Sequence, residues 1–377
     1  MNFKDFHAGR WVQQYEYQSF SPAPVNDDWT WDDPRINTLL EQATRAIGEL
    51  NAFSLIVPDV DLFIRMHVLK EANTSSRIEG TQTEIDEALR PKEMVAPERR
   101  DDWQEVQNYI EAMTQAINEL EALPLSNRLL RNTHRMLLEG ARGEGKLPGE
   151  FRKSQNWIGG SGPSDAAFVP PQHTEVSDLM NDLEKFLHNA AIQVPHLIRI
   201  AIAHYQFETI HPFLDGNGRI GRLLITLYLV SKGLLEKPTL YLSAHIEKHK
   251  GAYYDSLTRV RESNDLGHWV RFLLTAVRDT AHKGKETFQS ILTLRSEVEQ
   301  TTLSLGKRAE NARLLLNHLC RKPLVTPNEV AKLLSVTHQT ASSLIRNFEE
   351  LNILKKWEKI GRSQLYVFGC YLALFMD

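Results

Sequence analysis

Residues His211 to Arg222 place a candidate base, a metal ligand, a glycine turn and two arginines within twelve positions. The run reads HPFLDGNGRIGR, and its residue types suit phosphate chemistry. Gly216 and Gly218 have no side chain, so the loop can adopt left-handed dihedrals and its N–H groups can approach a phosphate closely. His211 is the only residue of the run with a near-neutral pKa, which makes it the candidate general base.

A helix is expected to follow the loop, because the apolar positions from Ile220 to Leu227 have helical spacing. Its N-terminus would direct free N–H groups and the positive end of the helix dipole at the bound anion. Arg219 and Arg222 would lie on one face of the first turns and bind phosphate oxygens in bidentate fashion. Asp215 offers hard oxygen ligands suited to a Mg²⁺ ion that bridges phosphates. The run therefore predicts a phosphate site with a metal ligand and a base.

The same run resembles the signature loop of the Fic family of AMP-transferring enzymes. The resemblance implies that His211 deprotonates a hydroxyl group on a target protein, that Asp215 holds Mg²⁺, and that pyrophosphate leaves ATP after attack at the α-phosphorus. It also implies that the loop glycines line an anion hole and that the two arginines bind the outer phosphates. The nucleotide-binding residues expected in the run are Gly216, Asn217, Gly218, Arg219, Ile220, Gly221 and Arg222.

Two other segments resemble the same family. Phe151 and Arg152, followed by residues 156–171, are expected to form a hairpin of two short apolar arms around a glycine-containing tip. This hairpin resembles the family's flap, which lays a target segment beside the site by strand addition. Downstream, Tyr253 and Tyr254 belong to a segment in which the second tyrosine lies against the nucleotide, so Tyr254 is a nucleotide-binding candidate. An ordinary core position is the alternative for Tyr253.

A further match lies upstream, where residues 74–80 read TSSRIEG. Residues 60–72 have helical apolar spacing, so the segment is expected to be the end of a helix that Gly80 terminates. Ser75, Glu79 and Gly80 fit the family's inhibitory pattern. By that resemblance, Glu79 pairs with Arg222 and leaves this arginine unable to hold the γ-phosphate. The alternative is a solvated helix end.

Composition sets the class of protein. The 377 residues suffice for two or three domains, and no apolar run approaches the length of a membrane span. The first twenty residues do not resemble a signal peptide, and Cys320 and Cys370 give neither a disulfide framework nor a metal-ligand spacing. We therefore expect a cytoplasmic protein without membrane contact. Homodimerisation is left open.

Charge separates the last part of the chain from the rest. Residues 301–377 carry 11 Lys and Arg against 6 Asp and Glu, whereas residues 1–300 carry 33 against 42. Helical segments at 307–320, 326–334 and 337–351, followed by two strand-like pieces around Gly361 and Arg362, resemble a winged helix-turn-helix. Polar and basic residues could contact DNA, but Glu349 and Glu350 oppose this. DNA and protein both remain candidate partners.

The predicted fold is mainly α: an all-helical Fic core with a small β-hairpin flap, followed by a C-terminal winged helix-turn-helix domain. The expected regions are an N-terminal helical region with the inhibitory helix (1–120), the catalytic core (121–300) and the winged domain (301–377). Helical apolar spacing also marks residues 33–50, 101–120, 125–139, 176–187, 198–210 and 268–298.

The leading functional hypothesis is a transferase that moves AMP from ATP to a hydroxyl of an unidentified target protein, itself included, and that Glu79 inhibits. One alternative is a related activity on the same scaffold, either removal of AMP or transfer of another phosphate-containing group. The other is a DNA-binding regulator whose core senses nucleotides. Because His211 and both arginines are present, the sequence favours catalysis over sensing.

Overall fold

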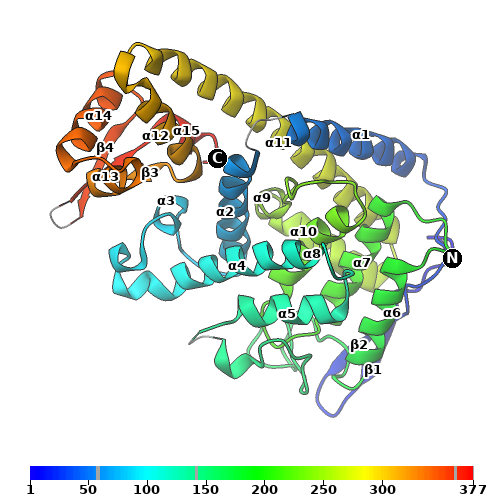
Figure 1. Ribbon diagram of the computed structural model, residues 1–377. Coiled ribbons are helices and arrows are strands. Elements are labelled where there is room, and N and C mark those ends of the chain that lie inside the picture. The colour runs from blue at the N-terminus through cyan, green and yellow to red at the C-terminus, as the bar shows by residue number, and fades with distance from the viewer. Residues whose placement is uncertain (57–59, 141–142, 361–362, 377) are drawn as a thin grey trace.

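The computed structural model describes residues 1–56, 60–140, 143–360 and 363–376 and is mainly helical (Figure 1). The helices are α1 Pro34–Ile56, α2 Val60–Ile78, α3 Ile85–Ala88, α4 Arg100–Glu119, α5 Asn127–Leu137, α6 Val176–His188, α7 His196–Ile210, α8 Asn217–Ser231, α9 Ser243–Lys248, α10 Lys250–Ser263, α11 Leu266–Leu303, α12 Ala309–Arg321, α13 Pro327–Leu334, α14 His338–Glu350 and α15 Gly369–Ala373. The strands are β1 Gly9–Gln13, β2 Gln18–Pro22, β3 Leu324–Val325, β4 Lys355–Ile360 and β5 Ser363–Val367. Short 3₁₀ turns span Lys92–Met94, Pro97–Arg99, Glu144–Lys146 and Gly306–Arg308.

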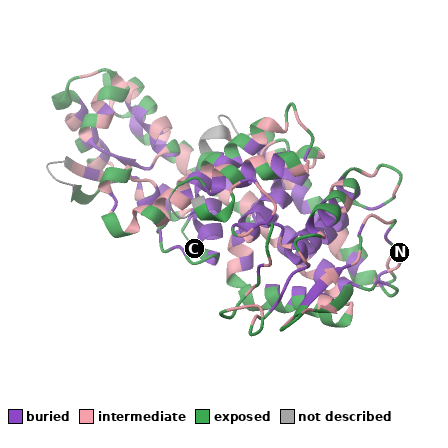
Figure 2. Ribbon diagram, turned by 90° about the horizontal axis from the view of Figure 1, so that it is seen from below, coloured by how far each residue is buried: buried purple, intermediate pink, exposed green. Residues whose placement is uncertain are grey.

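Two central helices, α7 and α8, carry the two ends of the signature loop. Every residue of α7 after His196 is buried, including polar side chains such as Arg199, His204 and Glu208, so α7 is surrounded by the rest of the protein. Helices α6 and α11 pack against α7, α4 and α5 pack against α8, and α1 packs along α11 (Figure 1). The loop between α7 and α8 is therefore anchored at both ends in buried helices. Buried residues gather in the interior of the protein (Figure 2).

The predicted mainly helical fold is confirmed, and each predicted helical range holds a helix with shifted ends. The helix expected after the loop is α8, which begins at Asn217 because Gly216, with a left-handed φ of 72°, is its N-cap. The β1–β2 hairpin near the N-terminus was not predicted.

The expected flap differs from the prediction. Residues 156–171 contain one isolated antiparallel bridge, Ile158 to Phe168, instead of two strand arms. Two proline residues end the second arm, and proline cannot donate a hydrogen bond to a ladder. The N–H of Phe20 in β2 donates to the carbonyl of Val169 at 2.9 Å, so the N-terminal hairpin supports the flap from outside.

The C-terminal lobe contains α12, α13 and α14 and an antiparallel sheet of order β3-β5-β4. Thr326 caps α13 in a reciprocal capping box with Glu329, and Ser335 makes the following turn with a φ of 52°. These helices lie where the sequence predicts them, whereas Gly361 and Arg362 fall outside the described residues. The lobe contacts the rest of the chain through α12 against α2 and α11, and through His67, whose ring packs on Phe288 and Phe375.

Among the described helices, none is both long enough and apolar enough to cross a membrane.

Candidate active site

His211 lies at a sharp corner where α7 ends. Its φ of 50° and ψ of 61° are left-handed, and its N–H donates to the carbonyl of Phe207 at 2.9 Å. This conformation is uncommon for a residue with a side chain and persists only where the surroundings impose it. The chain therefore leaves the axis of α7 at the predicted base.

The side-chain amide of Asn217 bridges the two polar groups of the Phe213 backbone. Asn217 accepts a hydrogen bond from the N–H of Phe213 and donates one to its carbonyl, both at 2.8 Å. The Asn217 side chain is buried, so its amide shapes the loop from inside.

A second side chain, His134 on α5, holds the same loop from the other side. Its Nδ1 accepts from the N–H of Gly149 at 2.9 Å, so Nε2 carries the hydrogen and donates to the carbonyl of Asp215 at 3.0 Å. The ring stacks on Phe213 with centroids 3.8 Å apart. Burial lowers the pKa of His134 to about 4, which keeps the ring neutral.

The Asp215 side chain suits its expected role as a metal ligand. It is 47% exposed, accepts from the N–H of Gly216 at 2.6 Å, and lies 3.8 Å from Arg219. The described residues contain no group of three or more His, Cys, Asp and Glu side chains that could hold a metal. A single carboxylate is compatible with Mg²⁺, which commonly takes one or two carboxylates and completes its shell with phosphate and water.

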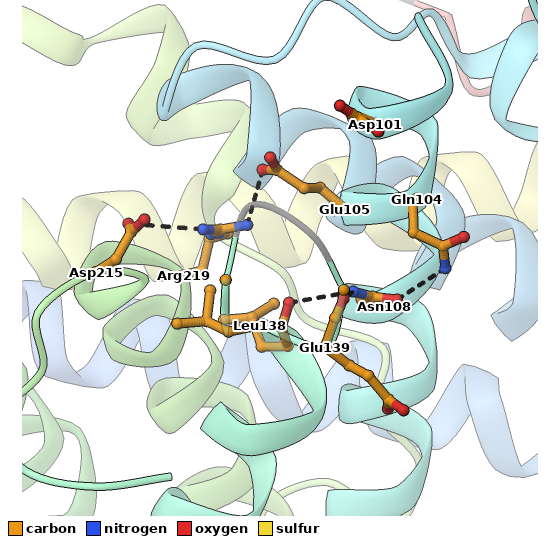
Figure 3. Close-up of a pocket in the computed structure, with 11 residues that line it drawn as sticks. Asp101, Gln104, Glu105, Asn108, Leu138, Glu139, Asp215 and Arg219 are labelled. Atoms are coloured by element: carbon orange, nitrogen blue, oxygen red, sulfur yellow. Dashed lines mark hydrogen bonds and ion pairs between the residues drawn. The ribbon is translucent and has the colours of Figure 1, made fainter. Parts of the chain in front are cut away.

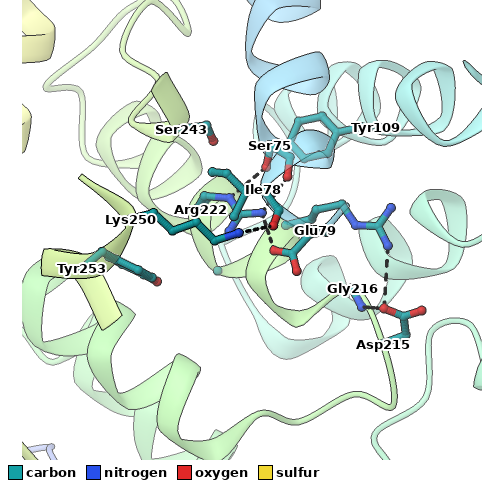
Figure 4. Close-up of polar contacts among 12 residues, drawn as sticks. Ser75, Ile78, Glu79, Tyr109, Asp215, Gly216, Arg222, Ser243, Lys250 and Tyr253 are labelled. Carbon is teal, nitrogen blue, oxygen red and sulfur yellow. Dashed lines mark hydrogen bonds and ion pairs between the residues drawn. The ribbon is translucent and has the colours of Figure 1, made fainter. Parts of the chain in front are cut away.

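The structure brings Ser75, Glu79 and Arg222 together (Figure 4). Arg222 donates from Nε to Ser75 Oγ at 2.9 Å, and from one terminal nitrogen to Ser75 O at 3.0 Å and Glu79 Oε1 at 2.7 Å. Burial acts to raise the pKa of Glu79, but the charge and hydrogen bond of Arg222, together with the charges of Arg219 and His211, hold the pKa below its ordinary value. Glu79 is therefore an ionised partner of a buried arginine.

The Glu79 carboxylate also lies over the glycine loop. A Cβ atom added to Gly218 would overlap Glu79 Oε1, so the carboxylate occupies the space that this glycine leaves open. Gly80, with a φ of 109°, ends the turn that delivers Glu79. The face of the loop at Gly218 is thus covered by a carboxylate from the segment after α2.

The first arginine of the run also meets a carboxylate. Arg219 is 3% exposed and donates to Glu105 Oε2 on α4 at 3.2 Å. Both residues line a pocket between α4, α5 and the start of α8 (Figure 3). The other residues that line this pocket are Asp101, Gln104, Asn108, Leu137, Leu138, Glu139, Gly140, Gly143 and Asp215.

The remaining residues of the run join α8 to its neighbours. Ile220 is 1% exposed, so its side chain belongs to the core. A Cβ at Gly221 would overlap Glu208 Oε1, so the glycine permits close approach of α7 and α8. The carbonyl of Gly221 lies 2.8 Å from His204 Nδ1, and His204 Nε2 lies 2.9 Å from the hydroxyl of Tyr253.

The two tyrosines of α10 have different surroundings. Tyr253 is 2% exposed and belongs to the core, which was the alternative considered for it. Tyr254 is 42% exposed. Of the pair, only Tyr254 is accessible to a ligand.

Comparison with known proteins identifies two matching family models. Residues 37–118 match the Fic/DOC family N-terminal model, and residues 124–229 match the Fic/DOC family model. Curated relatives named Protein adenylyltransferase Fic include one from Aedes aegypti, 37% identical over 134 residues, and one from Drosophila melanogaster, 31% identical over 133 residues. Each alignment covers 35% of this chain and 24% of the relative, so the chain matches about a quarter of the relatives' length.

Solved structures share the fold. A Fic family protein from Desulfovibrio desulfuricans aligns with a TM-score of 0.56 at 20% identity, covering 90% of this chain and 97% of its own. A Fic domain signaling protein from Bacteroides thetaiotaomicron aligns with a TM-score of 0.52 at 18% identity, covering 68% and 97%. At these identities the likeness concerns the fold alone.

Proposed function

Because this chain belongs to the Fic/DOC family, we propose that it transfers AMP from ATP to a hydroxyl side chain of a target protein, itself included. One observation carries the proposal. The ring of His211 is neutral and lies at a fixed corner, and two buried arginines, Arg219 and Arg222, follow in the first turns of α8. Burial, followed by the charge of Arg152, lowers the pKa of His211 to about 4, so its ring can accept a proton near neutral pH.

In this proposal, His211 takes the proton from the target hydroxyl as its oxygen attacks the α-phosphorus. A new oxygen–phosphorus bond forms, the bond to the bridging oxygen breaks, and pyrophosphate leaves. The N–H groups around Gly216 and Gly218 and the guanidinium groups of Arg219 and Arg222 would bind the phosphates. Mg²⁺ held by Asp215 would neutralise phosphate charge.

We further propose that the resting protein is autoinhibited. Glu79 accepts a hydrogen bond from a terminal nitrogen of Arg222 that would otherwise bind the γ-phosphate. The carboxylate also covers Gly218, where phosphate oxygens would approach. ATP could still bind through the other loop groups, in a pose unsuited to in-line attack.

To test the proposal, the protein is incubated with Mg²⁺, a cell extract and ATP that is labelled on either the α-phosphate or the γ-phosphate. Label on the α-phosphate is expected to become attached to protein, and label on the γ-phosphate is expected in released pyrophosphate. Protein carrying the γ-label would contradict AMP transfer. Omission of Mg²⁺, or its removal with EDTA, is expected to abolish the signal.

For the C-terminal lobe we propose a winged helix-turn-helix that contacts DNA. The proposal is supported by the exposure of His338, Gln339 and Thr340 on the first turn of α14. On β4, Lys355, Lys356 and Lys359 are also exposed, and they could bind phosphates beside a groove. Contact with a protein is the alternative.

DNA affinity of the full chain is expected to fall with salt, as phosphate binding requires. Changing both Lys355→Gln and Lys356→Gln should lower the slope of log affinity against log salt by about 2. The control, Lys146→Gln with Lys283→Gln, removes the same charge from exposed lysines elsewhere. Fluorescence anisotropy with labelled duplex DNA between 50 and 200 mM salt, a range within which about 10³-fold changes occur, measures both slopes. If the full chain binds no DNA at the lowest salt, contact with a protein replaces the proposal.

A further inference from the structure

Arg152 joins the flap to the corner at His211. Its side chain is 2% exposed, and Nε donates to the carbonyl of His211 at 3.0 Å. The two terminal nitrogens donate to the carbonyls of Ser154 at 3.2 Å, Pro171 at 2.5 Å and Ile210 at 3.3 Å. One guanidinium group therefore binds both ends of the flap and the last turn of α7.

The partners of this buried cation are backbone carbonyls. The carbonyls of Ile210 and His211 lie at the C-terminal end of α7, where the helix dipole is negative and favours a cation. The planar fork of arginine can reach several acceptors in one plane, which a lysine cannot do. The contacts thus use both the charge and the shape of the side chain.

The corner at His211 needs such support, because a left-handed conformation is unfavourable for a residue other than glycine. The carbonyl of His211 receives a second hydrogen bond from Asn156 at 3.3 Å, and Asn156 also donates to the carbonyl of Phe213 at 2.8 Å. Two side chains from the flap segment thereby fix the backbone on both sides of Pro212.

We propose that Arg152 is a positioning residue that holds the base and the flap as one rigid unit, so that a target hydroxyl laid along the flap meets His211 in line. The inference rests on the proposed function. Arg152 does not contact ATP in this proposal, because all its hydrogen-bond partners described above are carbonyls of the flap and of the C-terminal end of α7. Its loss should therefore lower the maximal rate and leave ATP binding intact.

The pKa of His211, which depends on nearby charges, provides a second test of the proposal. The charged groups that act on His211 are Arg152, Glu79 from the turn after α2 and Arg261 from α10, while Glu208 contributes its carbonyl. Glu79 raises the pKa of His211, and the two arginines lower it. Removal of the Arg152 charge is therefore expected to raise the pKa of His211.

The chain offers a matched control in Arg199 of α7. This arginine is 6% exposed and also donates to three carbonyls: Phe186 at 3.2 Å, Asn189 at 2.9 Å and Ile192 at 3.3 Å. None of these carbonyls belongs to the flap or the loop. Arg199→Gln thus reports the general cost of losing a buried guanidinium group that binds carbonyls.

The test compares Arg152→Gln, Arg152→Lys and Arg199→Gln in the full chain, each in a Glu79→Gly background. The rate of label transfer from α-labelled ATP is measured against ATP concentration. For both Arg152 variants we expect the maximal rate to fall about tenfold or more, with the KM for ATP unchanged within about twofold. Arg199→Gln should stay near the background rate. Equal rates for Arg152→Gln and Arg199→Gln would overturn the proposal.

An NMR titration of labelled histidines tests the effect of Arg152 on His211 without an activity measurement. The His211 signal is assigned by its loss in His211→Ala. The pKa of His211 should rise in Arg152→Gln and stay constant in Arg152→Lys and Arg199→Gln. An unmoved pKa in folded Arg152→Gln would contradict the contact. If no variant transfers label, the proposed function fails and this titration still tests Arg152. If Arg152→Gln does not fold, Arg152→Lys keeps the charge and an unchanged maximal rate in it would refute the positioning role.

Discussion

His211→Ala is expected to transfer AMP about 10²- to 10⁴-fold more slowly than the unaltered protein, the usual effect of losing a positioned general base. ATP binding should be retained, because the proposed phosphate contacts are made by the loop after this residue. Transfer from α-labelled ATP and equilibrium binding of ATP measure the two effects separately. His338→Ala, which removes an exposed histidine of the C-terminal lobe, is the matched control.

The same residue predicts the pH profile. Burial holds the pKa of His211 at about 4, and only the neutral ring can take a proton. The rate should therefore be independent of His211 between about pH 6 and 8 and should fall as the pH drops through about 4. An acid limb near the ordinary histidine value would contradict this burial, and full activity in His211→Ala would contradict the role of the base.

Glu79→Gly is expected to raise auto-modification about 10- to 100-fold. The change removes the carboxylate that competes with a γ-phosphate for Arg222, a charge-assisted interaction of about 1.5 to 3 kcal/mol. Label transfer from α-labelled ATP is the measurement. Glu84→Gly is the control, because it removes an exposed carboxylate and adds the same backbone freedom nearby.

The gain should depend on the arginine that is released. Glu79→Gly combined with Arg222→Ala is therefore expected to lose most of the increase, which makes the effects of the two changes non-additive. Equal or lower activity in Glu79→Gly alone would remove the support for autoinhibition. It would favour the alternative in which Glu79 takes part in removing AMP.

The sequence predicted the parts of the site that are contiguous. The run from His211 to Arg222 contains the reactive residue types in adjacent positions. The segment at the end of α2 matches a short family pattern, so both could be located from the sequence alone. The meeting of Glu79 with Arg222 was inferred from family resemblance, and the structure brings the two side chains to 2.7 Å.

The supporting residues could not be predicted. His134 and Glu105 belong to common residue types at positions far from the loop in sequence, and no local pattern marks them. Arg152 lies in the segment that resembles the flap, but that resemblance assigns it no contact with the loop. Their roles arise from packing, since each reaches the loop only because α4, α5 and the flap fold against α7 and α8. The β1–β2 hairpin was not predicted for a related reason. Both strands are short, and the residues of β1 are mostly exposed.

Glu79 lies beyond the last residue of α2, whereas Ser75 lies within the helix. Buried side chains such as Met66, Leu69 and Ala72 hold the body of α2 in the core. The turn that carries Glu79 follows this body and makes two backbone hydrogen bonds to the carbonyl of Ser76, at 3.0 Å from the N–H of Glu79 and at 3.2 Å from the N–H of Thr81. Helix ends open at lower free energy than helix bodies.

Under the proposed autoinhibition, fraying of this one turn would move Glu79 away from Arg222 without displacement of α2. The basal rate would then report the small population of molecules in which this turn is open at any moment. Any molecule that binds residues 79–83 better in the open form would activate the enzyme by mass action, to the extent of its preference for that form.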